Sequence, residues 1–371
     1  MKRRGKGEGS ISRRSDGRWM SRITIDGNRK YFYGETRQEV AKRMQDALHD
    51  IDRGLPIVGE RQTVAQFFDL WLPIAKSSIK QSTGERYELF VKIHVLPTLG
   101  KKILSKLTPA QLQALYTARL EAGASPTSIN HLHALLHVAL DSAVNLGLAP
   151  RNIADFVTPP RMKRPQMRVL TPEQVRTFLE AARGNEMEAL YVLALSTGMR
   201  QGELLALHWQ DVDLDHRHLQ VRWTVKRMST GFVFTEPKSA RSRRKIALTR
   251  MAVDALRAHH ARQAERRLKA TEWEDNDLVF PNGAGRPWEV GNLKGRNFWP
   301  LLRKAGLPLI RFHDTRHTAA TLLLLQGIHP KVVSEMMGHA TVSITLDLYS
   351  HVLPEMQQEA TAAMERLLSG Q

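Results

Sequence analysis

Alternating apolar and polar positions near the amino terminus predict a small β-sheet. Two such stretches cover residues 18–25 and 29–33, and turn-forming residues precede them at 15–17 and 26–28. Side chains alternate between the two faces of a strand, and Asp-Gly sequences favour tight turns. A three-stranded antiparallel meander is therefore expected.

A single helix is expected to follow this sheet. Thr36 and Glu39 have the spacing of a capping box, and apolar residues within 40–51 recur at helical spacing. Gly54 and the proline two residues later end the periodic run. The pattern predicts an amino-terminal module of one sheet and one helix over residues 1–58.

Residues 63–156 carry apolar positions at helical spacing throughout. Capping residues, two of them followed by proline, mark four helix starts. These starts lie at Thr63, Ser82, Thr108 and Ser125. A compact helical bundle is expected, and its three histidines, His131, His133 and His137, are assigned to packing or surface positions rather than to a metal site.

A basic, proline-rich stretch at 157–169 is expected to form an extended linker, because proline restricts the backbone around it. Thr171 then opens a third segment, 170–371, which is mostly helical with a β-rich insert near 218–248. The predicted fold class is multidomain and mainly α, with small β elements and a mixed α/β, mostly helical, last domain.

The charge of the chain narrows its possible partners. There are 55 lysines and arginines against 37 acidic residues, a formal net charge of +18, and each of the three segments is positive. This favours a clamp around a polyanion, with nucleic acid as the expected partner. No apolar run reaches the length of a membrane span and no apolar signal core follows the basic start, so a soluble, cytoplasmic protein is expected. Zero cysteines exclude disulfides and thiolate chemistry.

The amino-terminal module mixes aromatic and basic residues along its strands. A sheet face of this composition suits a groove of duplex DNA. The alternative is that the aromatic side chains form the small core of the module. The residues concerned are Trp19, Tyr31, Phe32 and Tyr33 with Arg18, Arg22, Arg29 and Lys30.

Candidate chemistry lies in the third segment. The run from Ser196 to Leu207 predicts a helix that ends at Gly198 and a second that begins there, so Arg200 projects from a helix amino terminus, where anions are favoured. Glu203 is placed to pair with it or to cap the helix. Further along, Lys238 lies in a turn between two predicted strands, and we expect it at the tip of a hairpin.

The carboxy-terminal part adds four residues suited to phosphate chemistry, His313, Arg316, His339 and Tyr349. A phenol has an ordinary pKa of about 10, so a tyrosine that attacks phosphorus needs neighbours that favour the phenolate and hold the phosphate. Arginine and histidine supply both. The set indicates chemistry on a phosphodiester.

Arg200, Lys238, His313, Arg316, His339 and Tyr349 resemble, in order and spacing, the phosphate site of the tyrosine recombinase (integrase) family. The resemblance covers the chain from about Thr171 onward. Residues 63–156 resemble the family's core-binding domain, and 1–58 is similar to the arm-type DNA-binding domain of phage integrases. Thr315 and Met337 depart from the usual leucines, and neither changes a charged group.

The resemblance implies a role for each arginine and histidine. Arg200 and Arg316 would hold the non-bridging phosphate oxygens and stabilise the charge of the transition state. His313 and His339 would donate hydrogen bonds to the phosphate, and His313 is also a candidate to accept the phenolic proton.

The resemblance further implies that Tyr349 forms a 3′-phosphotyrosyl ester with DNA and that Lys238 protonates the departing 5′ oxygen. The ester keeps the bond energy, so a 5′ hydroxyl can reverse the step without ATP, a metal or another cofactor. Basic residues beside Lys238 are alternative proton donors. Taken singly, each of the six residues also has a structural alternative, such as an ion pair, a helix cap or a core position.

Two metal sites are weighed and set aside. Asp211, Asp213 and Asp215 have the spacing that opens a calcium loop, but the glycine and glutamate that such a loop requires are missing, which favours an acidic turn. His313 and His317 are four residues apart, as zinc ligands on one helix face could be. The cationic Arg316 between them would lie beside the zinc ion and repel it, which disfavours a zinc site.

The function expected is integration and excision of a phage or other mobile element at double-stranded DNA attachment sites. An apolar stripe from Pro354 to Leu368 predicts a tail that folds back or docks on a neighbour, and the resemblance implies a homotetramer on DNA. An excisionase and host DNA-bending proteins are implied partners. The alternatives are a type IB topoisomerase, a non-catalytic DNA-binding regulator and a zinc hydrolase.

Overall fold

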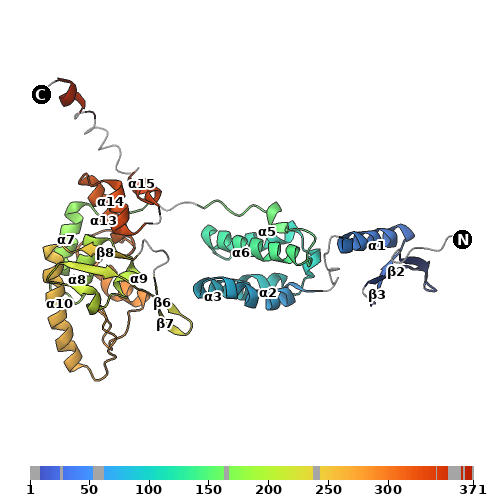
Figure 1. The fold of residues 1–371 in the computed structure, drawn as a ribbon, viewed down its shortest axis with the longest axis horizontal. Helices are drawn as coiled ribbons and strands as arrows, with labels where there is room; N and C mark the ends of the chain where they lie inside the picture. The colour runs from blue at the N-terminus through green and yellow to red at the C-terminus, as the bar shows by residue number, and fades with distance from the viewer. Residues whose placement is uncertain are drawn as a thin grey trace. The chain divides into compact units, whose positions relative to one another are not determined.

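The computed structural model describes residues 9–25, 28–52, 62–162, 167–236, 243–339, 341–349, 361 and 364–369 (Figure 1). The chain divides into two compact units, Met1–Arg164 and Pro165–Gln371. No helix of the described part is long and apolar enough to cross a membrane.

The amino-terminal module is a sheet with one helix, as predicted. The antiparallel strands are in the order β1-β2-β3, and α1 packs on one face of the sheet (Figure 1). Ile23 and Val40 are buried between them, and the Ser21 hydroxyl donates to the Val40 carbonyl at 3.3 Å. The elements are β1 (Ser10–Arg13), β2 (Trp19–Ile25), β3 (Asn28–Gly34) and α1 (Arg37–Asp52).

The predicted capping box of α1 is half correct. The Thr36 hydroxyl accepts the Glu39 N–H at 3.2 Å, but the Glu39 carboxylate accepts the N–H of Glu35 rather than that of Thr36. Glu39 also pairs with Arg43 one turn later, which draws its side chain along the helix. Gly54 lies outside the described residues.

The helical bundle is built from α2 (Val64–Ser78), α3 (Gln81–Phe90), α4 (Leu96–Leu99), α5 (Pro109–Glu121) and α6 (Pro126–Asn145). A π-helical turn, Val91–Val95, joins α3 to α4 without a break. The helices share one core of buried aliphatic and aromatic side chains. The predicted bundle is confirmed.

Three of the four predicted helix starts in the bundle are correct. Thr63 caps α2 through the Gln66 N–H, Ser125 caps α6, and α5 begins at the proline after Thr108. Ser82 is wrong as a cap, because the Lys80 carbonyl already accepts the N–H groups of the third and fourth residues after it. The helix therefore begins one residue before Ser82.

The first residues of the predicted linker, 157–160, pack against the bundle, so the extended segment is shorter than predicted. Val157 is buried in the bundle core, and the Asn130 side chain donates to the Pro160 carbonyl at 2.8 Å. The histidines take the expected surface and packing roles: His133 bonds to the Tyr116 hydroxyl, and His137 pairs with two aspartates.

The second unit is mainly helical with two small sheets. Its helices are α7 (Pro172–Ala182), α8 (Glu188–Thr197), α9 (Gln201–Leu204), α10 (Arg250–Lys269), α11 (Val290–Leu293), α12 (Trp299–Lys304), α13 (Asp314–Leu325), α14 (Pro330–Met337) and α15 (Val342–Tyr349). Its strands are β4 (Val212–Asp213), β5 (His218–Val221), β6 (Thr224–Met228), β7 (Gly231–Thr235) and β8 (Arg244–Ala247).

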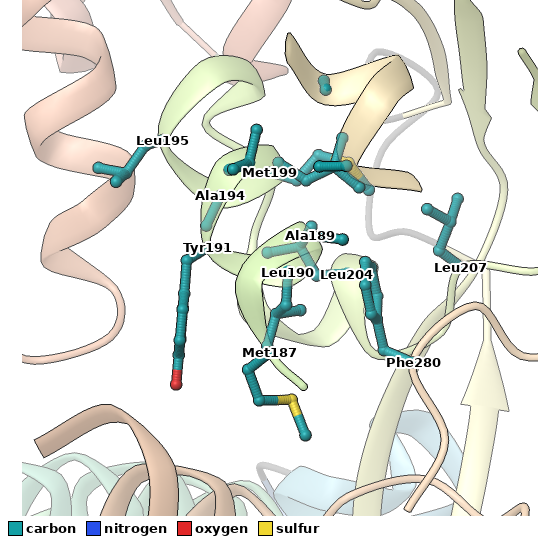
Figure 2. Packing of buried hydrophobic residues seen from close by; sticks show 14 of the residues in the cluster. Met187, Ala189, Leu190, Tyr191, Ala194, Leu195, Met199, Leu204, Leu207 and Phe280 are labelled. Atoms are coloured by element: carbon teal, nitrogen blue, oxygen red, sulfur yellow. The ribbon is translucent and has the colours of Figure 1, made fainter. Parts of the chain in front are cut away.

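Helix α8 is the centre of this unit. It is apolar on all sides and packs against α7, α10 and α13, as expected for a helix that no face exposes to water. Figure 2 shows Leu195 on one side of it, while Leu204 and Phe280 from neighbouring elements lie on another. Because α8 is fixed on several sides, the turn that follows it has a defined position.

The β-rich insert is confirmed, but its pairing corrects one prediction. The strand orders are β4-β5-β8 and β6-β7, so β7 and β8 belong to different sheets. Lys238 lies between β7 and β8 and therefore does not join two paired strands as a hairpin would; the residue itself is outside the described part. The hairpin turn of the insert lies between Met228 and Gly231, which pair with each other.

The acidic triplet forms a turn, as predicted. One carboxylate oxygen of Asp213 accepts the N–H groups of Asp215 and His216, and Asp211 pairs with Arg222 at 3.0 Å. Among the described residues no group of three or more potential metal ligands lies close enough together to hold an ion.

A buried histidine makes the stability of the second unit depend on pH. His259 of α10 is 2% exposed, and its Nε2 lies 2.7 Å from the Val279 carbonyl, to which it donates. Burial, above all, lowers the pKa of His259 from 6.5 to about 4, although the bond to Val279 opposes the shift. The unfolded chain thus binds a proton at a pH where the folded chain does not, so the stabilisation is complete above pH 6.5 and is lost as the pH falls toward 4.

We predict that His259→Gln removes about 3 kcal/mol of the stability loss that the wild type shows between neutral pH and pH 4. Urea unfolding followed by tryptophan fluorescence at several pH values measures it. His260→Gln, at the exposed neighbouring position, is the control; because the charge of His260 makes only the smallest contribution to the lowered pKa of His259, this variant should keep most of the pH dependence. An identical pH dependence in His259→Gln and the wild type would contradict the assignment.

Candidate active site

The first site residue, Arg200, is positioned by a glycine. Helix α8 ends at Gly198 in the left-handed conformation, φ 61° and ψ 24°, where glycine is favoured. A Cβ at this position would also clash with the Met337 thioether. Arg200 is then the amino-terminal cap residue of α9, as predicted, and its side chain is 37% exposed, so a ligand can reach it.

Glu203 lies beneath Arg200 and binds it twice. Its Oε2 accepts the Arg200 backbone N–H at 3.0 Å, and its Oε1 accepts Arg200 Nη1 at 2.7 Å. Arg244 Nη2 donates to Oε2 from the other side at 3.0 Å. Burial alone would raise the pKa of Glu203, but Arg244 and Arg200 outweigh it, so the pKa is lowered and the group is ionised at neutral pH.

Arg244 is a site residue that the sequence analysis missed. It opens β8 and is buried, and its Nε donates to the Met336 carbonyl at the end of α14, at 2.7 Å. A signal was available in the alternation of β8, because Arg244 falls on the same face as the buried Ile246. An arginine on the apolar face of a strand needs a buried partner, which here is Glu203.

Arg316 lies in the first turn of α13 and is 3% exposed. Its Nη1 donates to the Gly198 carbonyl at 2.7 Å, while its Nη2 is buried with no hydrogen-bond partner in the described part. Burial above all, together with the charges of Arg200 and Arg244, lowers the pKa of Arg316 to about 9, although Glu203 opposes the shift. The guanidinium is charged at neutral pH and short of one acceptor.

His339 follows a second left-handed glycine. Helix α14 ends at Gly338, φ 66° and ψ 46°, and the Gly338 carbonyl accepts Arg200 Nη2 at 2.8 Å. His339 is buried, with Nδ1 2.8 Å from the hydroxyl of Thr345. Burial, followed by the charges of Arg316 and Arg200, lowers the pKa of His339 to about 3, so the ring is neutral at neutral pH.

His313 is the residue before α13, and its ring meets that of His317 edge to face, with centroids 4.9 Å apart. The pKa of His313 is lowered, mainly because burial removes water from the ring and then because of the charges of His317 and Arg316. The start of the helix is held by Asp314, which accepts Arg311 Nη2 at 2.8 Å and the Arg311 N–H at 2.8 Å.

Tyr349 is the last residue of α15, and its side chain lies outside the described part, as does all of Lys238. Helix α15 packs against α13, which carries Arg316, and against α14, which ends two residues before His339. Of the six candidates, Arg200, Arg316 and His339 lie close enough together for the two arginine charges to act on each other and on the histidine.

The arrangement is suited to an anion. Three guanidinium groups, from Arg200, Arg244 and Arg316, surround the single carboxylate of Glu203, so the cluster carries excess positive charge. Charge-assisted bonds from forked donors are the strongest that a side chain offers to phosphate. Neutral histidines beside them can donate or accept one proton each.

Comparison with known proteins shows the family of the chain. The model of the Phage integrase family matches residues 168–356, and the model of the phage integrase N-terminal SAM-like domain matches residues 63–118. A tyrosine recombinase XerC-like protein of Caldanaerobacter subterraneus subsp. tengcongensis is 30% identical and covers 91% of this chain and 92% of its own. An integrase of Streptomyces ambofaciens is 28% identical, over 98% of this chain and 97% of its own.

Solved structures show the same fold. The Tn1549 transposon integrase in complex with transposon right end DNA has a TM-score of 0.67 at 25% identity, covering 83% of this chain and 100% of its own. A lambda integrase tetramer bound to a Holliday junction has a TM-score of 0.57 at 18% identity, covering 94% and 96%. The chain belongs to the phage integrase family of tyrosine recombinases, the site-specific recombinases that cleave and rejoin DNA.

Proposed function

We propose that the cluster around Glu203 is the phosphate site of this recombinase. The observation that carries the proposal is the buried Arg316 Nη2, which has no acceptor in the described part of the protein, beside an excess of positive charge. A non-bridging oxygen of a scissile phosphate would supply the acceptor. Arg200, partly exposed, would hold a second oxygen, and both would stabilise the charge that grows in the transition state.

The remaining four candidates complete the proposed reaction. The Tyr349 oxygen attacks phosphorus, forms the 3′-phosphotyrosyl bond and displaces the 5′ oxygen. His313, whose lowered pKa leaves it neutral, accepts the phenolic proton, and His339 donates a hydrogen bond to the phosphate. Lys238, or a basic neighbour, gives a proton to the departing 5′ oxygen.

We predict that a suicide DNA substrate forms a covalent adduct with the wild type and none with Tyr349→Phe. Arg316→Ala should slow adduct formation by 100-fold or more, on the order found for loss of one transition-state donor. Denaturing gel electrophoresis of labelled DNA measures both. Tyr191→Phe is the matched control, because this buried hydroxyl of α8 has no partner in the described part and its removal should leave the adduct yield unchanged.

The same assay separates the alternatives. A non-catalytic regulator would give no adduct with any variant. A topoisomerase would form the adduct and relax supercoils but would not exchange strands between two paired attachment sites. Persistence of the adduct in Tyr349→Phe would refute the assignment of the nucleophile.

We propose that residues 1–58 form an arm-type DNA-binding domain that binds through the open face of its sheet. The register pairs Arg22 with Tyr31 and Thr24 with Arg29, and such pairs share one face of the sheet. Because Ser21 and Ile23 face α1, this pair of rows lies on the face away from the helix. Tyr31 is 43% exposed there, so the aromatic core alternative does not account for it.

We predict that Arg22→Ala and Arg29→Ala each weaken binding to arm-type DNA by about tenfold, the range of a lost base or phosphate contact, and lower its salt dependence. Cleavage of a core-site suicide substrate should not change. Lys42→Ala on the exposed side of α1 removes the same charge and is the control. Equal effects of the three substitutions would show that only overall charge matters.

We propose that the bundle over 63–156 and the catalytic domain over 170–371, joined by the linker over 157–169, both bind the DNA of the core site, and that four copies assemble on paired sites. Residues 364–369 are helical, and Leu367 and Leu368 are 76% and 78% exposed, which leaves apolar surface for a neighbouring copy. An excisionase and host DNA-bending proteins would set the direction of the reaction.

We predict that a chain ending at Leu353 binds single sites but no longer forms tetramers with paired attachment sites. Gel filtration and crosslinking of the full-length and shortened chains with the same DNA measure this. Leu367→Lys is a milder variant that should weaken assembly while leaving single-site binding intact. Unchanged assembly of the shortened chain would reject the role of the tail.

A further inference from the structure

Helix α15 is joined to the arginine cluster by one buried hydrogen bond. Thr345 of α15 is 0% exposed, and its Oγ1 lies 2.8 Å from Nδ1 of His339. Thr345 lies four residues before Tyr349 on the same helix, a separation of one turn. The bond therefore connects the helix of the proposed nucleophile to a ring that lies beside the phosphate site.

The direction of this bond follows from burial. A buried hydroxyl whose proton finds no acceptor costs free energy, and Nδ1 of His339 is the acceptor that the described residues offer to Thr345. The hydroxyl therefore donates and Nδ1 accepts. The single proton of the neutral ring is then on Nε2, which has no hydrogen-bond partner among the described residues.

The surroundings of the ring keep it neutral, so the position of its one proton matters. Besides burial, a positive charge on His339 is opposed by four neighbouring side chains. They are Arg316 and His317 of α13, Arg200 at the start of α9 and Arg244 of β8. With the proton on Nε2, the ring can donate to a phosphate oxygen. With the proton on Nδ1, a lone pair of Nε2 would face the anion and repel it.

We propose that Thr345 is a positioning residue for strand cleavage, whose hydroxyl fixes His339 in the tautomer that can donate from Nε2. This inference rests on the proposed function of His339 as a phosphate donor. The hydroxyl is supplied by the helix that also carries Tyr349. The histidine is consequently set for donation only when that helix is docked, which couples completion of the phosphate site to delivery of the nucleophile.

The test compares the full-length wild type with two variants on a suicide DNA substrate under single-turnover conditions. Thr345→Val keeps the shape of the side chain but removes the hydroxyl, and it should slow cleavage about 10- to 100-fold, the effect of removing a group that orients a histidine. Thr345→Ser keeps the hydroxyl and should restore cleavage close to the wild-type rate. DNA affinity should be the same in all, since the bond acts on the ring and not on binding.

A double-mutant cycle separates positioning from packing. If Thr345 acts through His339, adding Thr345→Val to His339→Ala should cause little further loss, whereas independent packing effects would multiply. If Thr345→Val does not fold, Thr345→Ala against Thr345→Ser makes the same comparison.

Two results would overturn the inference: a wild-type cleavage rate in Thr345→Val, or equal losses in the valine and serine variants. Failure of the proposed function looks different, because the wild type itself would then give no adduct or Tyr349→Phe would retain one.

Discussion

The buried carboxylate of Glu203 is the interaction on which the catalytic domain depends. It accepts bonds from Arg200 and Arg244 while almost fully enclosed, and so holds together the start of α9 and the start of β8. Moving such ions out of water is costly, and removing one partner of a buried pair typically destabilises a protein by about 3 to 5 kcal/mol. The main effect of the cluster is therefore to position the guanidinium groups of Arg200 and Arg244 rather than to add net stability.

Backbone carbonyls at the ends of two helices bind arginines of this cluster. The carbonyl of Gly198, at the end of α8, accepts Arg316, and the carbonyl of Gly338, at the end of α14, accepts Arg200. Each glycine adopts the left-handed conformation that ends its helix and turns its carbonyl toward an arginine from a distant part of the chain. Displacing the turn at Gly198 would move the carbonyl that holds Arg316, and displacing the turn at Gly338 would move the one that holds Arg200.

Features that depend on residues close together in the sequence were predicted correctly. Gly198 ending one helix, Arg200 opening the next and Glu203 returning to it are all events within six residues, and the structure confirms them. Arg244 escaped prediction because its partners lie 41 and 92 residues away and only the folded chain brings them together. The hairpin expected at Lys238 failed for the same reason, since turn signals show where strands end but not which strands pair.

The excess charge of the cluster is the physical basis of the proposed phosphate site. Arg316 is held in place by one carbonyl, but its buried Nη2 has no acceptor in the described residues, and its pKa is lowered to about 9 by burial and by its cationic neighbours. On the proposed function, a bound phosphate would supply the missing acceptor and offset the excess positive charge, and the donors are already in place to meet it. Preorganised donors of this kind act most strongly where negative charge is greatest, which is on the non-bridging oxygens of the pentacoordinate transition state rather than on those of the ground-state diester. In the proposed reaction, the unbalanced charge of the cluster would therefore stabilise the transition state of cleavage more than the bound substrate.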